Sequence, residues 1–280
     1  MNKQPILDPF LGVTSTGVAT SDLNKFLGSV LEKITLNLGG GVFTKSMLTL
    51  IELKANGKVI YQTTGANLEL SNLYNGGAVD STMLKIDFMD RKARTTNAWQ
   101  AGALDCSAAS GITSLRLEAT IAGATTPTLV GFADLSPPTD DPAEKSIRWV
   151  MNRRHRVTQV IGAAGQFALL IPHVDPAGGG SNFRRIYVYS ALITGIKTVR
   201  EGVTEHEVTS LQNSASQRDN FKSPQANLLV FDPVQDLQLS GRTWDTRPVS
   251  GIRSAQFYAN FSGAETITIE TEELLPLAAY

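Results

Sequence analysis

The chain has 280 residues, of which 42% are hydrophobic and 18% are charged, and its formal net charge is -1. These values are typical of a globular protein with one large or two ordinary domains. They exclude a disordered chain, and they exclude a protein that is drawn to nucleic acid by its overall charge. The single cysteine, Cys106, excludes an intrachain disulfide and a cysteine-rich zinc site, and we expect it to be a small buried side chain.

The first residues lack the apolar core of a signal peptide, and no apolar stretch approaches the ~20 residues of a membrane span. From this pattern we expect a soluble protein that is made in a cytoplasm.

The N-terminal residues predict an arm with a short amphipathic helix. Apolar residues at 23, 26, 27, 30, 31 and 34 follow helical spacing, and Ser21 is a suitable N-cap. One interpretation packs this helix beneath the sheet of its own domain. The other makes residues 1–31 an arm that faces a neighbouring subunit or a membrane surface. In that second interpretation, the residues facing lipid or a neighbour are Leu23, Phe26, Leu27 and Val30, with the lysines Lys25 and Lys33 beside them.

The rest of the chain predicts many short β-strands that are separated by glycine-rich turns. Apolar and polar side chains alternate in residues 115–121 and again in residues 255–261, as expected of half-buried strands. Turn sequences such as Asn56–Gly57 separate the candidate strands. This pattern favours a β-sandwich or a jelly roll. The other candidate strands are KITLNL, SMLTLIEL, KVIYQT, MLKIDFM, QFALLIP, RRIYVYSALI, NLLVFD and ETITIET.

Two segments indicate that the chain contains an internal duplication. GITSLRLEATIAGA begins at Gly111 and GIRSAQFYANFSGA begins at Gly251, which is 140 residues later, and the two share six residues and the same alternation. Upstream of each lies a tryptophan, Trp99 or Trp244, and before it a strand with Asp and Phe, KIDFMD or LVFDPVQD. Further upstream, NGKVIY has a looser counterpart in TGIKTV. These matches predict two similar β-domains in tandem.

The stretch DLSPPTDDPAEKSIRWVMNRRHR, residues 134–156, falls where the first copy ends. Its prolines do not suit a central strand, and they stiffen a short linker. We therefore predict β-domains at residues 32–136 and 147–280, joined by a linker at residues 137–146. The basic residues that open the second domain predict a solvated edge or an edge between subunits, with little support for phosphate binding. They are Arg148, Arg153, Arg154, His155 and Arg156.

The sequence offers few candidates for a metal site. Glu205 and Glu207 flank His206, but on a strand they face away from it, which argues against a shared metal ion. His173 and Asp175 alternate so that they share a face, yet only two ligands are visible there. The remaining candidates, for structural calcium, are weak because they lack EF-hand spacing, and they are the linker carboxylates Asp140, Asp141 and Glu144.

No motif predicts catalysis. The GGG runs lack the Lys that follows in a phosphate-binding loop, and no G-x-S-x-G sequence is present. Trp99, Trp244 and Tyr258 form a candidate sugar-binding platform, although the low aromatic content favours burial in the core. We therefore predict no enzymatic activity, no catalytic residue and no cofactor.

The tandem arrangement resembles the double jelly-roll major capsid proteins of tailless icosahedral bacteriophages that contain an internal membrane, with the corticovirus type as the nearest likeness. The resemblance rests on strand order and on the segments ITLNLGGGVFTKSMLTLIELKANGKVIYQT, SIRWVMNRRHRV and FRRIYVYSALITGIK. It implies an all-β fold of two tandem eight-stranded antiparallel jelly rolls, with the short helical arm at the N-terminus.

The same resemblance implies a major capsid protein that self-assembles as pseudo-hexagonal homotrimers into an icosahedral virion shell over an inner membrane. Implied partners are neighbouring capsomers, vertex (penton) proteins, membrane-associated virion proteins and inner-membrane lipid, without sequence-specific nucleic acid. The implied location is the virion, after synthesis in the cytoplasm of a bacterial host. The alternative is a tandem β-sandwich binding module, such as a carbohydrate-binding or phage fibre protein. A stable trimer in solution favours the shell, whereas a monomer that binds oligosaccharide favours the module.

Overall fold

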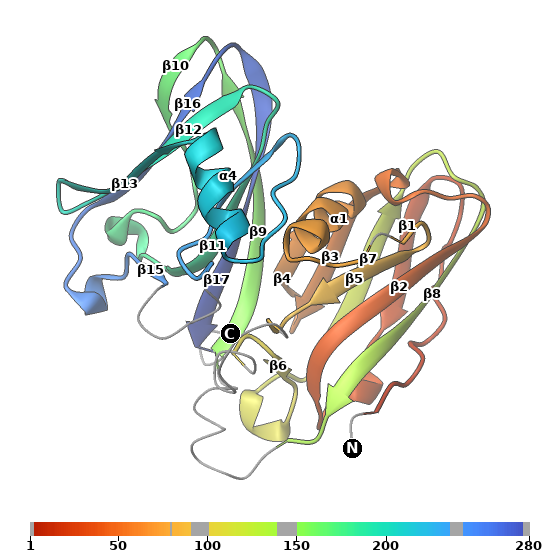
Figure 1. The fold of residues 1–280 in the computed structure, drawn as a ribbon. Helices are drawn as coiled ribbons and strands as arrows, with labels where there is room; N and C mark the ends of the chain where they lie inside the picture. Colours follow the sequence, from red (N-terminus) through yellow and green to blue (C-terminus); the bar gives the residue numbers. More distant parts are fainter. Residues whose placement is uncertain (1–2, 79, 91–100, 139–149, 236–242, 277–280) are drawn as a thin grey trace. The chain divides into compact units, whose positions relative to one another are not determined.

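In a computed structural model, the described part of the chain consists of residues 3–78, 80–90, 101–138, 150–235 and 243–276. The chain divides into two compact units that are built mainly from antiparallel strands (Figure 1). The first unit comprises residues 1–72, 77–154 and 275–280, and the second comprises residues 73–76 and 155–274.

The first unit contains two sheets of antiparallel strands. One sheet has the order β1 (Gly17–Asp22), β7 (Leu115–Ile121), β3 (Leu48–Ala55) and β4 (Lys58–Thr63). In the other, β2 (Val30–Val42) pairs with β5 (Met83–Asp87), β6 (Leu104–Asp105) and β8 (Thr125–Ser136). The helix α1 (Gly65–Tyr74) follows β4, and the short 3₁₀ helices are η1 (Asn24–Phe26), η2 (Lys45–Met47) and η3 (Ala108–Ser110).

The second unit repeats this plan. One sheet has the order β10 (Gly165–Ala168), β16 (Ala255–Phe261), β12 (Ile193–Arg200) and β13 (Val203–Thr209). The other contains β9 (Val150–Ile161), β17 (Glu265–Pro276), β11 (Asn182–Tyr189) and β14 (Leu228–Phe231), with β15 (Trp244–Asp245) paired to β11. The helix α4 (Ser210–Asp219) follows β13, and the 3₁₀ helices are η4 (Pro176–Gly178) and η5 (Pro248–Ser250).

The order of elements confirms the predicted duplication. In the first unit β1 pairs with β7 so that Gly17 faces Ile121, and in the second β10 pairs with β16 so that Gly165 faces Phe261. The helices also correspond, since α1 follows β4 and α4 follows β13. In the first unit the place of β9 is taken by residues 3–6, which bridge to β8. The predicted pairing of Gly111 with Gly251 holds, because each glycine ends a 3₁₀ helix in the left-handed conformation before β7 or β16.

One of the sequence matches was wrong. NGKVIY contributes to β4, whereas TGIKTV belongs to β12, whose counterpart in the first unit is β3. The reason is that the distance between equivalent elements is not constant along the chain. Ile193 of β12 follows Leu48 of β3 by 145 residues, whereas Ala255 of β16 follows Leu115 of β7 by 140. A single offset therefore aligns the last strands correctly and shifts the middle ones.

Each unit has its own hydrophobic core, and the predicted alternation fixes which side chains enter it. Along β7 the inward residues, from Leu115 to Ile121, are at most 1% exposed, and the polar residues between them point outward. The burial pattern of β16 matches that of β7 position by position. This match confirms the core prediction for both strands.

The predicted N-terminal helix is not present. Residues 17–22 form β1, residues 24–26 form the 3₁₀ helix η1, and β2 begins at Val30. Gly28 has φ of 89°, a left-handed conformation that ends any helical segment at this point. The helical spacing arose because a 3₁₀ turn and the start of a buried strand follow each other, and both place apolar residues inward. Residues 17–31 therefore belong to the first jelly roll and do not form a separate arm.

Candidate functional site

The predicted lipid- or neighbour-facing residues lie inside the first unit. Leu23, Phe26 and Val30 are at most 2% exposed, and all three side chains are buried within this unit. Leu27 is half-buried and packs against the same core. The prediction that this stripe faces lipid or a neighbouring subunit was therefore wrong, and the interpretation that packs it within its own domain holds.

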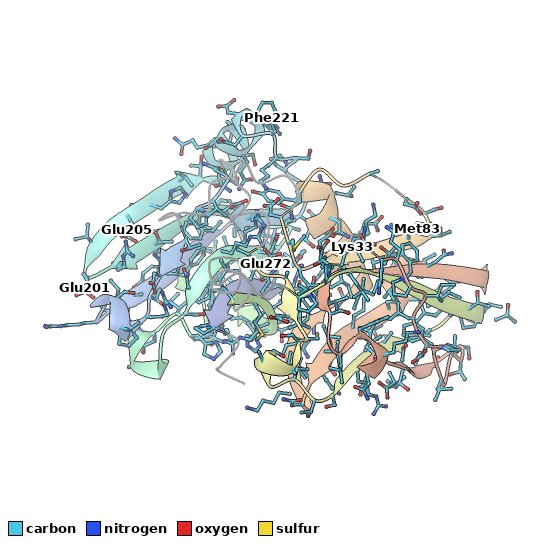
Figure 2. All side chains as sticks on the ribbon, turned by 90° about the horizontal axis from the view of Figure 1, so that it is seen from below. Lys33, Met83, Glu201, Glu205, Phe221 and Glu272 are labelled. Atoms are coloured by element: carbon cyan, nitrogen blue, oxygen red, sulfur yellow. The ribbon has the colours of Figure 1, made fainter. Side chains whose placement is uncertain are left out.

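The two flanking lysines are tied to carboxylates of the same unit. Lys25 Nζ lies 2.7 Å from Asp8 Oδ1 at the surface. Lys33 Nζ, on β2, lies 2.6 Å from Asp134 Oδ2, whose side chain is nearly buried (Figure 2 labels Lys33). These lysines support the fold locally, and neither projects from an exposed apolar face.

The candidate calcium ligands Asp140, Asp141 and Glu144 lie outside the described residues, as does Arg148 of the basic run. Within that run, Arg154 corrects the expectation of a solvated edge, because its side chain is 2% exposed. Its Nη1 donates to Tyr61 Oη (3.1 Å) and to Ser71 Oγ (3.2 Å). The Tyr61 ring also lies under the guanidinium, with its centroid 5.6 Å from Arg154 Cζ, so the ring and the two hydroxyl groups hold this cation in place.

The segment Glu205–Glu207 forms no metal cluster. A β-bulge in the pairing of β12 with β13 places Glu205 and His206 beside the same cavity, so the strict alternation expected from the sequence does not hold. Glu205 accepts a hydrogen bond from Trp244 Nε1 (3.0 Å) and pairs with Arg200. His206 packs on the Phe231 ring, and burial lowers the pKa of its imidazole. These groups are held by one another and do not converge on an ion.

The cavity beside these residues measures about 400 Å³ and lies between α4 and the β12–β13 hairpin. Trp244, at its wall, is 4% exposed and packs against Phe183, Phe231 and Phe257 with ring centroids 5.7 to 6.1 Å apart. This confirms that Trp244 is a core residue, so it does not form a sugar platform. Trp99 lies outside the described residues.

A buried ionic network crosses the other sheet of the second unit. Arg185 on β11 donates through Nε to Asp232 (2.8 Å) and through Nη1 to Glu272 on β17 (3.2 Å). Tyr187 Oη donates to the second oxygen of Glu272 (2.9 Å). This network was not predictable from the sequence, because its charged residues lie in three separate strand regions and each by itself resembles an outward-facing polar residue.

His173, which was expected to share a strand face with Asp175, has different partners in the structure. Asp175 accepts from the Ala177 N–H and begins η4. His173 instead lies beside His155 of β9 and Glu273 of β17. No local sequence motif links the three residues, because Glu273 lies 118 positions after His155 in the chain. The only available signals were the His-x-Asp spacing at residues 173–175 and the presence of His155 in the basic run.

Cys106 is buried, as expected. Burial raises the pKa of its thiol to about 12, so it has no thiolate at neutral pH and no nucleophilic role. Among the described residues, no helix is long and apolar enough to cross a membrane.

Two models of one protein family match the chain. Residues 5–136 match the viral coat protein P2 N-terminal domain, and residues 151–277 match the viral coat protein P2 C-terminal domain. No curated protein sequence matches the chain.

Several solved structures share the fold over almost the whole chain. The crystal structure of the major capsid protein P2 from bacteriophage PM2 has a TM-score of 0.82 at 15% identity and covers 98% of this chain and 97% of that one. The STIV MCP has a TM-score of 0.71 at 12% identity, and the match covers 99% of this chain and 97% of that one. The PBCV-1 virus capsid has a TM-score of 0.61 at 10% identity, and the match covers 98% of this chain and 93% of that one. At these identities the likeness establishes the double jelly-roll fold.

Proposed function

The chain belongs to the viral coat protein P2 family, and from this premise we propose that it builds an icosahedral virion shell from homotrimers. The duplication within the chain carries this proposal. Because each subunit contains two jelly rolls with the same order of elements, three subunits present six similar domains. A threefold oligomer of this kind approximates a hexagon, which is a shape that tiles a closed shell.

Exposed apolar side chains support a contact surface on each unit. In the second unit, Val160 at the end of β9 and Leu170 after β10 are each 74% exposed. Gln159 links these segments, since its side chain donates to the Ala168 carbonyl (3.0 Å) and accepts from the Leu170 N–H (2.8 Å). The two apolar side chains therefore lie at one corner, between the first two strands of this jelly roll.

The first unit exposes apolar residues at the equivalent corner. Leu11 is 71% exposed and bridges to Thr20 on β1, and Val18 on the same strand is 50% exposed. Since β1 corresponds to β10, both units expose apolar residues beside this strand, although each unit also exposes apolar residues elsewhere, such as Val130 and Leu211. A ring of six similar domains needs such repeated surfaces, so we assign this corner to contacts between subunits.

Light scattering after size-exclusion chromatography tests the proposal. We expect a particle of about 90 kDa, three times the 30.1 kDa chain. The double variant Val160→Asp/Leu170→Asp is expected to run as a folded monomer, because carboxylates in an apolar contact are strongly disfavoured. The matched control is Val249→Asp, which replaces an 85% exposed valine on η5, outside the corner, and should remain trimeric.

A wild-type protein that stays monomeric at micromolar concentration would contradict the homotrimer. A double variant that remains trimeric would leave the trimer standing and would reject only the corner as its contact surface. The inner membrane, the vertex and membrane-associated partners and synthesis in a bacterial cytoplasm follow from the resemblance alone. The N-terminal stripe adds no support for a lipid contact, because it is buried.

A further inference from the structure

We propose that the second unit binds a zinc ion through His155, His173 and Glu273. The three residues come from β9, from the segment between β10 and β11, and from β17. One ligand atom of each lies within 4.8 Å of the other two. Within the described ranges, no other set of three His, Cys, Asp or Glu side chains converges in this way. The inference concerns an ion site and does not depend on the trimer proposed above.

The distances between these side chains fit a shared ion. His173 Nδ1 lies 3.4 Å from Glu273 Oε2. Two ligands of a tetrahedral zinc ion, each at ~2.0–2.1 Å from the metal, lie roughly 3.3 Å apart. The rings of His155 and His173 have centroids 5.3 Å apart and are tilted by 45°, so they are not stacked face to face. A small inward movement would place one nitrogen of each ring and one carboxylate oxygen around a single ion.

The carboxylate is buried and oriented by hydroxyl groups. Glu273 is fully buried, Ser181 Oγ donates to its Oε2 (2.7 Å), and Thr271 Oγ1 donates to its Oε1 (2.8 Å). Hydrogen bonds of this kind hold the ligands of protein metal sites in position. A divalent cation would also offset the cost of a carboxylate that has been removed from water.

The loop that carries His173 is held in an unusual conformation. The φ of His173 is 61°, which a residue with a side chain adopts only when its surroundings impose it. Thr246, which is fully buried, helps to impose it. Its Oγ1 hydrogen-bonds to the His173 carbonyl (3.2 Å) and accepts from the Ser181 N–H (2.9 Å). The same threonine therefore positions one ligand and the serine that orients another.

The donor set selects the type of metal. Calcium prefers six to eight oxygen ligands, whereas two imidazoles and one carboxylate suit zinc. Three protein ligands leave a fourth position, and the His173 side chain is 34% exposed, so water can reach that position. The bound ion would join three chain segments and stabilise the second unit.

The test uses untagged full-length protein from which metal has been removed with a chelator. Isothermal titration with zinc sulfate is expected to show one ion per chain, and zinc is expected to raise the unfolding temperature. Replacing zinc by cobalt is expected to give the intense visible absorption of a four-coordinate site. His155→Ala and His173→Ala are expected to abolish binding, and Ser181→Ala is expected to weaken it about 10–100-fold.

His206→Ala is the matched control, because His206 is the third histidine of the chain and lies outside this cluster. It should bind zinc as the wild type does. Wild-type protein that binds no zinc overturns the proposal. Loss of binding in His206→Ala, with binding kept in His155→Ala and His173→Ala, also overturns it. Should the alanine variants fail to fold, the cobalt spectrum of the wild type decides. Four-coordinate absorption supports the site, and a weak octahedral spectrum rejects it.

Discussion

The hairpin between β3 and β4 in the first unit has a counterpart between β12 and β13 in the second. Asn56 has φ of 49°, and its side-chain oxygen accepts from the N–H groups of Thr113 (2.8 Å) and Ser114 (3.2 Å). Glu201 has φ of 53°, and its carboxylate accepts from Arg253 (2.5 Å) and Ser254 (2.8 Å). A glycine follows in both turns. The left-handed backbone conformation and the side-chain hydrogen bonds are the same in both turns, although the residue is Asn56 in one and Glu201 in the other.

The interiors of the two units have diverged further. In the first, Thr35 of β2 faces Phe132 of β8. In the second, Arg185 of β11 faces Glu272 of β17, at the heart of a buried ionic network. Phe132 and Glu272 occupy equivalent positions, 140 residues apart, as do Ile121 and Phe261. The comparison indicates that turns and capping bonds preserve the jelly roll, whereas an equivalent strand pair carries Thr and a half-buried Phe in one unit and a buried ion pair in the other.

The largest effect is expected when a charged residue is placed at equivalent positions in the two cores. We expect Leu117→Asp and Phe257→Asp each to destabilise the protein by more than about 4 kcal/mol, because both create an unpaired buried charge. Arg116→Asp and Gln256→Asp, on the outward faces of the same strands, are the matched controls and should fold. Calorimetry with limited proteolysis measures the effect, and wild-type stability in either core variant would refute the shared core pattern.

The ionic network should make the second unit more sensitive than the first at the equivalent strand pair. Arg185→Leu is expected to cost about 3–5 kcal/mol, because it removes the cation that bridges two buried carboxylates, leaving Asp232 with Lys222 at 3.8 Å and Glu272 with the Tyr187 hydroxyl. Thr35→Val should be neutral or stabilising, since Thr35 Oγ1 is buried and hydrogen-bonds to none of the described residues. Urea unfolding compares the two variants. Equal losses in the free energy of unfolding would show that the ionic network does not make the second unit more sensitive than the first.

The repeated glycines should respond alike. Gly111 and Gly251 have φ of 74° and 82°, and a methyl group at either would meet nothing within 4 Å. The cost of Gly111→Ala or Gly251→Ala is therefore backbone strain alone, about 1–2 kcal/mol in each unit. Chemical denaturation measures both values. A much larger effect in one unit would show that the two loops are not equivalent.

The smallest expected effect concerns Asp245, which begins the loop before Gly251. Burial opposes its ionisation, but hydrogen bonds from Arg247 and Ser250 outweigh burial and lower its pKa from 3.8 to about 2. Because the folded pKa is depressed, its contribution is fully present above pH 3.8 and is lost as the pH falls through 2. Allowing for solvent screening, Asp245→Asn should cost about 1 kcal/mol at pH 7.

Asp105 occupies the equivalent place and also accepts a backbone N–H, from Ser107 (2.8 Å). Asp105→Asn therefore serves as the comparison for Asp245→Asn. Unfolding measured from pH 7 down to pH 2 checks the sign, since the Asp245→Asn deficit should shrink as the pH approaches 2. A deficit that grows on acidification would contradict the assignment.

The sequence predicted the strands best where alternation and turn residues agree. The segments at residues 115–121 and 255–261 alternate strictly and follow a glycine, so both the strands and their equivalence were predictable. The N-terminal helix was not, because apolar residues at 23, 26, 27, 30 and 31 arise from a 3₁₀ turn followed by a strand that is buried on both faces. Local periodicity does not distinguish that combination from a helix.

The ion site and the ionic network depend on contacts that no local pattern contains. His155, His173 and Glu273 come together only because β9 and β17 lie in one sheet and the His173 loop folds beside them. Arg185 and Glu272 likewise meet through the register of β11 with β17. The exposed corner residues were also not predictable, because an apolar residue in a strand or next to one is ordinarily expected to face the core.

We propose that each subunit contributes two equivalent jelly rolls to a threefold capsomer, and single-particle electron cryo-microscopy of the purified oligomer would show this arrangement. We expect a particle with threefold symmetry in which six similar β-barrel densities surround the axis. A monomer, or an oligomer without six similar densities around a threefold axis, would contradict it.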